Sequence, residues 1–191
     1  EAAERLQDAG IKALSIHGRT RCQMYKGASD WQLIGEVKNN PRIHIPVFGN
    51  GDISSPEKAL DYKNKYGVDG IMIGRAAIGH PWIFREIKQF METGEPAPPP
   101  TVAERISVCK DHLARSIAWK GEGKGMYAMR GKYAGYLRGL PGISAFTKRL
   151  MQLTAFDEIV SVLDEGLAFY KGYEPVRMPV ELINYHEKCV V

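Results

Sequence analysis

Apolar residues in the first half of the chain form short continuous runs. Between these runs lie segments whose apolar residues recur at the spacing of an α-helix. The runs are rich in β-branched residues and predict strands at 11–16, 43–48 and 68–73. Apolar positions at helical spacing predict helices at 1–9, 31–38, 56–66 and 81–93. Strands that are apolar on both faces are typical of parallel sheets covered by helices, so this half is predicted to be α/β. A barrel and a doubly wound open sheet both fit the pattern.

A proline-rich connector and a purely helical pattern follow. Residues 96–100 read Pro-Ala-Pro-Pro-Pro, which neither a helix nor a central strand accommodates. Thr101 and Glu104 form a capping box that begins the next helix, and Thr154 is placed to cap a later one. Helices are expected at 101–119, 126–138, 143–152 and 155–170, with glycine-rich loops at 121–125 and 139–142 and one more helix at 178–185. The predicted domains are three β/α units at 1–95, a linker at 96–100 and an all-α helical bundle at 101–191.

Two of the predicted strands end in glycine loops that precede a helix. Gly49-Asn50-Gly51-Asp52 follows one strand, and Gly74-Arg75 follows the next. A glycine such as Gly51 lets the backbone approach a phosphate, a helix start supplies N–H donors, and Arg75 adds a forked cation. Asn50 and Asp52 are suited to hydrogen-bond a heterocycle or a polyol hydroxyl. The same residues also make ordinary turns, but two such loops on successive strands favour a phosphate site.

A polar loop after the first strand carries further candidate chemistry. His17 ends that strand and is suited to polarise a carbonyl or to hold the edge of a ring, although a single histidine is more often structural. Arg19, Arg21 and Gln23 follow it, and this favours a binding loop. The other histidines and the cysteines show no ligand spacing, so no metal site is predicted.

The charge of the chain is modest overall but unevenly distributed. The formal net charge is +4, yet residues 105–149 contain ten Lys or Arg against two acidic residues, Asp111 and Glu122. A basic segment of this kind is typical of a polyanion-binding surface, and an ordinary solvated helix surface is the alternative. Aromatic residues are interleaved with the cations, which suits RNA, whereas Tyr133 and Tyr136 at i, i+3 spacing also fit a helix core.

The composition argues against several classes of protein. No run of about eighteen apolar residues is present, so no membrane span is predicted. Cys22, Cys109 and Cys189 are widely spaced, which fits reduced thiols and a cytoplasmic location better than a disulfide framework. The chain starts in a charged helical pattern without methionine, so we expect a piece of a longer protein.

Four motifs together resemble the tRNA-dihydrouridine synthase family, in the bacterial B-type branch once labelled nitrogen-regulation proteins. They are the run from His17-Gly-Arg-Thr-Arg to Trp31, Ile45-Pro-Val-Phe-Gly-Asn-Gly-Asp-Ile53, Asp69-Gly-Ile-Met-Ile-Gly-Arg-Ala-Ala77 and Pro81-Trp-Ile-Phe84. Further along, Arg130 and Arg138-Gly-Leu-Pro-Gly142 are similar to the tRNA-binding domain of that family. There the family's Arg-Lys-His run reads Arg130-Gly131-Lys132, and an expected tryptophan is Gly135.

The resemblance implies the C-terminal part of a (β/α)8 TIM barrel, followed by a helical tRNA-binding domain. The family enzymes bind FMN and use NADPH to reduce the C5–C6 bond of uridines in tRNA. By position, the FMN-binding residues would be His17, Asn50, Gly51, Asp52, Gly74 and Arg75, and the tRNA contacts would be Arg19, Arg21, Arg130, Lys132 and Arg138. The general-acid cysteine belongs to an Asn-x-Gly-Cys-Pro motif that these residues do not contain, so none is assigned a catalytic role.

Three expectations follow for a chain that lacks the N-terminal half of the barrel. It should be inactive alone, it should associate with itself through open strand edges, and tRNA should be its partner. Two other functions remain open: another FMN-dependent barrel oxidoreductase, of the dihydroorotate-dehydrogenase type, or a non-enzymatic RNA-binding module.

Overall fold

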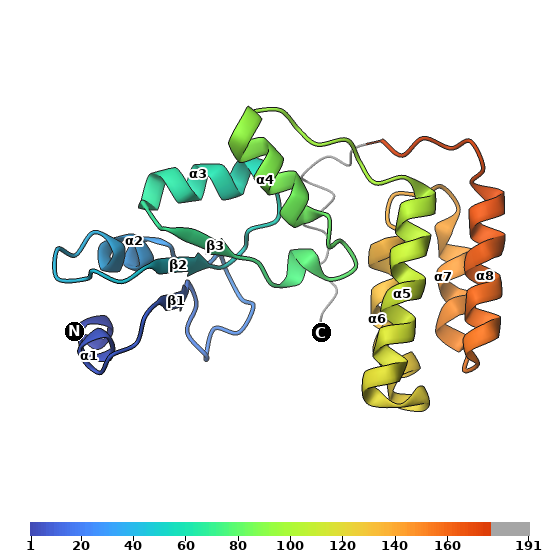
Figure 1. Cartoon of the computed structure of the whole chain (residues 1–191), viewed down its shortest axis with the longest axis horizontal. Coiled ribbons are helices and arrows are strands. Elements are labelled where there is room, and N and C mark those ends of the chain that lie inside the picture. Colours follow the sequence, from blue (N-terminus) through green and yellow to red (C-terminus); the bar gives the residue numbers. More distant parts are fainter. Residues whose placement is uncertain (177–191) are drawn as a thin grey trace. The chain divides into compact units, whose positions relative to one another are not determined.

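The computed structural model describes residues 1–176, which divide into two compact units (Figure 1). One unit, here called the β/α unit, contains Glu1–Ala77 and Ile83–Ala97. Among the described residues, the other, here called the helical unit, contains Ile78–Trp82 and residues 98–176. The segment Ile78–Trp82 therefore belongs to the helical unit, although it lies within the first half of the sequence. The helix expected at 178–185 lies outside the described residues.

The β/α unit is built on a parallel sheet of β1 (Leu14–His17), β2 (Val47–Asn50) and β3 (Gly70–Met72), in that spatial order. Its α/β character and its three parallel strands agree with the sequence prediction. Each strand, however, starts two to four residues later than predicted, since the apolar runs were expected to pair from 11, 43 and 68. Pairing between backbones defines a strand, and the leading apolar residues of each run precede the ladder.

The register brings the carboxyl ends of the strands together. His17 pairs with Asn50 across β1 and β2, and Asn50 pairs with Met72 across β2 and β3. The predicted glycine loop is therefore partly strand, because Gly49 and Asn50 complete β2. The side chains that follow the three strands meet at one edge of the sheet.

The helices of the β/α unit are α1 (Ala2–Asp8), α2 (Gln32–Lys38), α3 (Pro56–Tyr66) and α4 (Ile83–Thr93), with a 3₁₀ turn, η1, at Arg75–Ala77. The bounds of α3 are those predicted, and its ends explain why. Ser55 accepts a hydrogen bond from the N–H of Lys58 at the start, and Gly67 takes a left-handed conformation (φ 68°) at the end. Trp31, Ile34 and Ile83 belong to the buried cluster of this unit.

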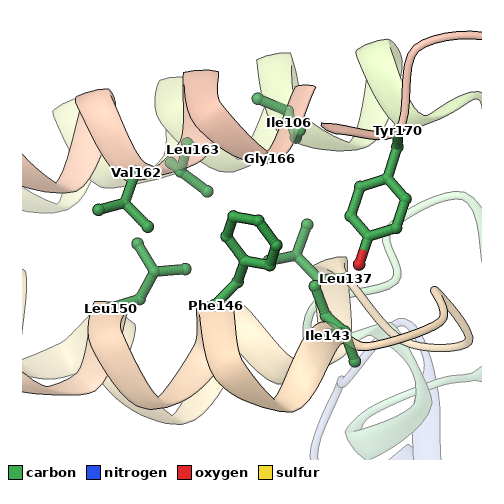
Figure 2. Close-up of a pocket in the computed structure, with 9 residues that line it drawn as sticks. All are labelled: Ile106, Leu137, Ile143, Phe146, Leu150, Val162, Leu163, Gly166 and Tyr170. Carbon is green, nitrogen blue, oxygen red and sulfur yellow. The ribbon is translucent and has the colours of Figure 1, made fainter. Parts of the chain in front are cut away.

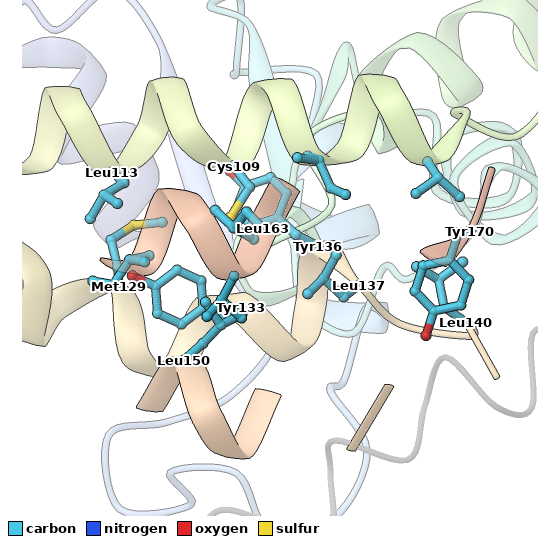
Figure 3. Close-up of a cluster of buried hydrophobic side chains, with 14 of the residues drawn as sticks. Cys109, Leu113, Met129, Tyr133, Tyr136, Leu137, Leu140, Leu150, Leu163 and Tyr170 are labelled. Atoms are coloured by element: carbon cyan, nitrogen blue, oxygen red, sulfur yellow. The ribbon is translucent and has the colours of Figure 1, made fainter. Parts of the chain in front are cut away.

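The helical unit contains α5 (Val102–Lys120), α6 (Glu122–Tyr136), α7 (Ile143–Gln152) and α8 (Phe156–Phe169). Thr101 caps α5 as predicted, because its hydroxyl accepts from the N–H of Glu104. Figure 3 shows side chains of α5, such as Cys109 and Leu113, directed toward Met129 and Tyr133 of α6. Both Tyr133 and Tyr136 are buried, so the core interpretation of these tyrosines is correct. The bundle architecture itself stays a prediction.

Two local predictions in the helical unit are wrong. Residues 122–125 are the first turn of α6 and not a loop, so Gly121 alone (φ 79°) separates the two helices. Gly125 is required for contact, because a Cβ there would lie 2.6 Å from the Cα of Ile117 in α5. Thr154 does not cap α8, whose N-cap is Ala155 and has no side-chain cap bond.

Candidate functional site

The loops at the carboxyl ends of the strands are tied together by backbone and amide hydrogen bonds. The N–H of Gly18 donates to the carbonyl oxygen of Asn50 over 2.9 Å. The side-chain amide of Asn50 donates to the carbonyl oxygen of Met72 over 2.7 Å, which links β2 to β3. His17, the register partner of Asn50, is exposed at this edge. The side-chain amide of Asn50 is therefore hydrogen-bonded within the sheet, whereas the ring of His17 is exposed to solvent.

Close packing against Trp31 and Ser29 explains the two glycines that flank Asn50. A Cβ on Gly49 would lie 2.1 Å from the indole ring, and one on Gly51 would lie 2.7 Å from the Cβ of Ser29. The indole N–H donates to the carbonyl oxygen of Gly51 over 2.9 Å, and Gly51 has a φ of 137°. Glycine is needed here first for close packing inside the protein.

Asp52 is the charged centre of the site. Its carboxylate receives both terminal nitrogens of Arg19, at 2.8 and 2.7 Å, and one terminal nitrogen of Arg75 at 2.7 Å. The N–H of Ser29 donates to the same carboxylate over 2.8 Å. Burial alone would raise the pKa of Asp52, but the bonds from Arg19 and Ser29 outweigh it and hold that pKa below its usual value.

Arg19 and Arg21 have opposite environments, although sequence reasoning paired them. The side chain of Arg19 is only 2% exposed and also donates to the carbonyl oxygen of Gly27 over 2.6 Å. Its Nε has no hydrogen-bond partner. Arg21 is exposed on the loop. The guanidinium of Arg19 is thus held inside the protein, whereas that of Arg21 faces solvent.

Arg75 is ion-paired with Asp52, but part of its side chain is exposed to solvent. Its side chain is 40% exposed, and its guanidinium lies 4.6 Å from the ring centroid of Tyr25. Apart from Gly74 itself and its neighbours in the chain, no heavy atom lies within 4 Å of the position that a Cβ on Gly74 would take. Arg19, Asp52 and Arg75 together carry a formal charge of +1, and its exposed part is on Arg75. Sequence reasoning missed Tyr25, although it lies inside the His17–Trp31 motif.

The predicted cationic residues of the helical unit occupy three environments. The guanidinium of Arg130 lies 5.5 Å from the ring centroid of Tyr127, which is exposed. The ammonium of Lys132 donates to the carbonyl oxygen of Ala128, one turn earlier. Arg138 is half-buried, and this burial lowers its pKa. Arg130 is thus the one of these three that is placed beside an exposed aromatic ring.

Three further reactive or titratable groups of the helical unit are buried or hydrogen-bonded within it. Arg105 is buried and donates to the carbonyl oxygens of Pro100 and Arg138. Burial raises the pKa of Cys109 to about 12, so its thiol is unreactive at neutral pH. His112 lies 2.8 Å from the hydroxyl of Tyr136.

The helical unit also contains a small apolar cavity (Figure 2). Its volume is ≈ 10 Å³, close to the least that a single water molecule needs. Figure 2 shows Phe146 and Leu150 of α7 facing Val162 and Leu163 of α8 across it. Such a void is a packing defect and not a ligand site. A larger groove of ≈ 370 Å³ lies in the β/α unit along β3, between Ile71, Phe84 and Met91.

Two negative findings apply to the described residues. Within residues 1–176, no group of three or more His, Cys, Asp or Glu side chains is placed to hold a metal ion. In the same part of the chain, no helix has the length and apolar character needed to cross a membrane.

Comparisons with known proteins agree on one family. A family model described as dihydrouridine synthase (Dus) matches residues 1–170. The chain is 39% identical over 171 residues to a probable tRNA-dihydrouridine synthase 1 of Synechocystis sp., which covers 90% of this chain and 47% of that protein. It is 44% identical over 151 residues to a tRNA-dihydrouridine synthase B of Pseudomonas putida, covering 79% of this chain and 44% of that protein. The chain thus spans about half the length of these curated relatives.

Proposed function

The chain belongs to the dihydrouridine synthase family, and from that premise we propose that it is part of a flavin-dependent tRNA-dihydrouridine synthase. The reaction proposed is reduction of the C5–C6 double bond of uridines in tRNA, with NADPH as the electron source. When bound, FMN supplies the two-electron chemistry. The residues described here would hold the phosphate end of that cofactor and part of the tRNA.

The site at the end of β2 and β3 fits the phosphate of FMN. The environment of Arg75 is the observation that carries this proposal. Its guanidinium is a half-exposed forked cation, and the space beside the preceding residue, Gly74, is open. The net positive charge of the Arg19–Asp52–Arg75 cluster suits a phosphate dianion. His17, exposed at the neighbouring strand end, is proposed to contact the ring system, and Asn50 and Gly51 the polyol.

Two of the expected contacts receive different roles in this proposal. Asp52 is surrounded by Arg19, Arg75 and the N–H of Ser29, so we assign it to holding the loop and not to binding a hydroxyl. Arg19 is 2% exposed, so we assign it to the same ionic cluster and not to tRNA. Arg21 remains the proposed tRNA contact of this loop.

A comparison of FMN with riboflavin tests the phosphate site. Riboflavin lacks only the phosphate, so a phosphate site predicts tighter binding of FMN, measured by quenching of flavin fluorescence. Arg75→Gln should remove that preference, whereas Lys88→Gln on the exposed face of α4 should keep it. Equal affinities of the unaltered chain for FMN and riboflavin would contradict the proposal.

The helical unit is proposed to bind tRNA. Its support is the excess of cations in residues 105–149, together with exposed aromatic rings at Trp119 and Tyr127. Arg130, Lys132 and Arg138 are the proposed phosphate contacts. Arg130→Gln should weaken tRNA binding and lower the slope of log K against log salt by about one ion. Arg115→Gln, whose guanidinium is paired with Asp111, is the matched control with little expected change.

The sheet is proposed to be the last three strands of a (β/α)8 barrel. The groove along β3 supports this, because its lining includes Ile71, Phe84 and Met91 and it borders a strand at the edge of the described sheet. Self-association of the chain through such edges, and its inactivity alone, stay predictions. Light scattering at high concentration tests the first, and turnover with FMN, NADPH and tRNA tests the second.

The two alternative functions make different predictions for the same measurements. A dihydroorotate-type oxidoreductase would bind FMN without affinity for tRNA. A non-enzymatic RNA-binding module would bind tRNA without a preference for FMN over riboflavin. Binding of both by one chain favours the synthase.

A further inference from the structure

The loop between Arg19 and Asp30 is closed at both ends by one side chain. Arg19 reaches the carboxylate of Asp52 with two terminal nitrogens, and the N–H of Ser29 reaches the same carboxylate from the other end of the loop. Arg19 also donates to the carbonyl oxygen of Gly27. Asp52 lies 23 residues beyond Ser29 in the sequence, two residues after the end of β2. The carboxylate therefore fixes the loop to the sheet edge.

The outer part of the loop contacts Arg75. Met24 (φ 49°) and Gly27 (φ 70°) take left-handed conformations on either side of Tyr25. The ring of Tyr25 covers the guanidinium of Arg75 at 4.6 Å, and the edge of that guanidinium donates to Asp52. Arg75 is thus held by two contacts, one from the loop and one from the carboxylate that anchors the loop.

We propose that Tyr25 and Asp52 are positioning residues that hold Arg75 ready for an anion, so that anion binding at Arg75 and closure of the Arg19–Asp30 loop are coupled. This inference rests on the proposed role of Arg75 in binding the phosphate of FMN. It adds that the loop, and Tyr25 in particular, sets the affinity for that phosphate. Neither residue needs to touch the phosphate to do so.

The coupling follows from the geometry of a guanidinium. Arginine has five N–H donors, and the structure shows one terminal nitrogen of Arg75 donating to Asp52. Contact with the ring of Tyr25 on one side and the bond to Asp52 on the other restrict the movement of the group, which leaves its remaining donors available. A long side chain held in its binding orientation loses less entropy when the anion arrives. By linkage, an anion on Arg75 must then favour the closed loop by the same factor.

Tyr25→Leu and Tyr25→Phe test the positioning role, with FMN and riboflavin as probes. A cation–π contact at a partly exposed site predicts about a two- to fivefold weaker affinity for FMN in Tyr25→Leu. The affinity for riboflavin should not change, and Tyr25→Phe should restore the FMN value. Equal weakening of both ligands, or no weakening of either, would overturn the coupling.

Limited proteolysis tests loop closure without any measurement of activity. Trypsin can cleave after Arg21 and Lys26, which are exposed on the loop. FMN should slow cleavage at these two sites in the unaltered chain but not in Tyr25→Leu, and riboflavin should not slow it. Cleavage after Lys148, in the helical unit, serves as the internal control.

The outcomes separate this inference from the proposed function. If the unaltered chain binds FMN no better than riboflavin, both fail. If it prefers FMN, but Tyr25→Leu keeps that preference and the loop is cleaved equally fast with and without FMN, only the coupling fails.

Discussion

The ion pair at the candidate site of the β/α unit is buried, whereas an ion pair on α5 of the helical unit is exposed. The Arg19–Asp52 pair is 2% and 8% exposed, and it lies at the candidate site. The Arg115–Asp111 pair on α5 is 79% and 59% exposed. The buried apolar cluster is larger in the helical unit. Among the described residues it contains sixteen buried residues, against seven in the cluster of the β/α unit. Packing thus holds the helical unit together, and much of the order at the candidate site comes from an ionic cluster.

This difference indicates how each unit uses its polar residues. A buried cluster holds an exposed cation such as Arg75 in one geometry, which suits a small ligand of defined shape. Exposed cations are only weakly held by their partners, as Arg115 is by Asp111, so they can follow an extended polyanion. Phe48 and Met72 of the short strands are also exposed, so the sheet presents apolar side chains to solvent.

Breaking the two ion pairs separately should produce the largest contrast. Asp52→Asn leaves the guanidinium of Arg19 buried without its partner, so we expect a loss of about 3–5 kcal/mol in the free energy of unfolding of the β/α unit. Asp111→Asn should cost no more than about 0.5 kcal/mol. Urea unfolding followed by methionine-methyl NMR measures each unit separately, with Met91 and Met129 as reporters. Similar losses in the two variants would contradict the contrast.

A cavity in the helical core should have the next largest effect. Leu113 is fully buried between α5 and α6, so Leu113→Ala is expected to cost about 2–5 kcal/mol in the free energy of unfolding of the helical unit. Leu33→Ala, at an exposed position of α2, is the matched control and should change stability by less than about 0.5 kcal/mol. The same urea experiment measures both, and a small effect of Leu113→Ala would show that the helical core is not closed.

Replacing a glycine of α6 by alanine should lower stability at one position and raise it at another. Gly125→Ala places a Cβ 2.6 Å from the backbone of Ile117, so α5 and α6 must separate, at an expected cost of about 1–3 kcal/mol. Gly123→Ala meets no atom within 4 Å and should stabilise the helix by up to about 1 kcal/mol. Thermal unfolding of the two variants gives the sign directly, and equal signs would refute the packing explanation.

Asp52 of the β/α unit and the buried Cys109 and Tyr136 of the helical unit should lose their contributions to stability at opposite ends of the pH scale, by at most about 1.4 kcal/mol per pH unit for each group. The pKa of Asp52 is lowered in the folded state, so its contribution is present above the unfolded pKa of about 3.9 and is lost as pH falls below it. Burial raises the pKa values of Cys109 and Tyr136 to about 12. Their contribution is therefore complete below the unfolded values and is lost as pH rises toward 12. Methyl NMR of Met91 and Met129 across pH checks which unit unfolds first at each end.

Local signals in the sequence were sufficient for several features. Ser55 and Gly67 mark the ends of α3, and each acts within a few residues of its own position. Thr101 likewise begins α5. The glycine loops were placed at the correct ends of the strands, and the family resemblance identified from their motifs is correct. These features depend on residues that are close in the sequence.

The errors share a different origin. The stretch 121–125 contains three glycines and so resembles a loop, yet Gly125 is there because α5 passes too close for a side chain. The strands begin later than their apolar runs because backbone pairing with a distant strand defines the ladder. Neither a helix contact nor a strand register is visible from the residues of one segment.

The sequence alone determined the order of elements, the two glycine loops and the candidate chemistry of Arg75. Tertiary structure decided that Asp52 holds Arg19 and Arg75 and that Tyr25 covers Arg75. Asp52 lies 33 residues from Arg19 and 23 from Arg75, so no local pattern could pair them. A charged side chain has many potential partners along a chain. Burial selects among them, because an unpaired charge away from water is too costly to keep.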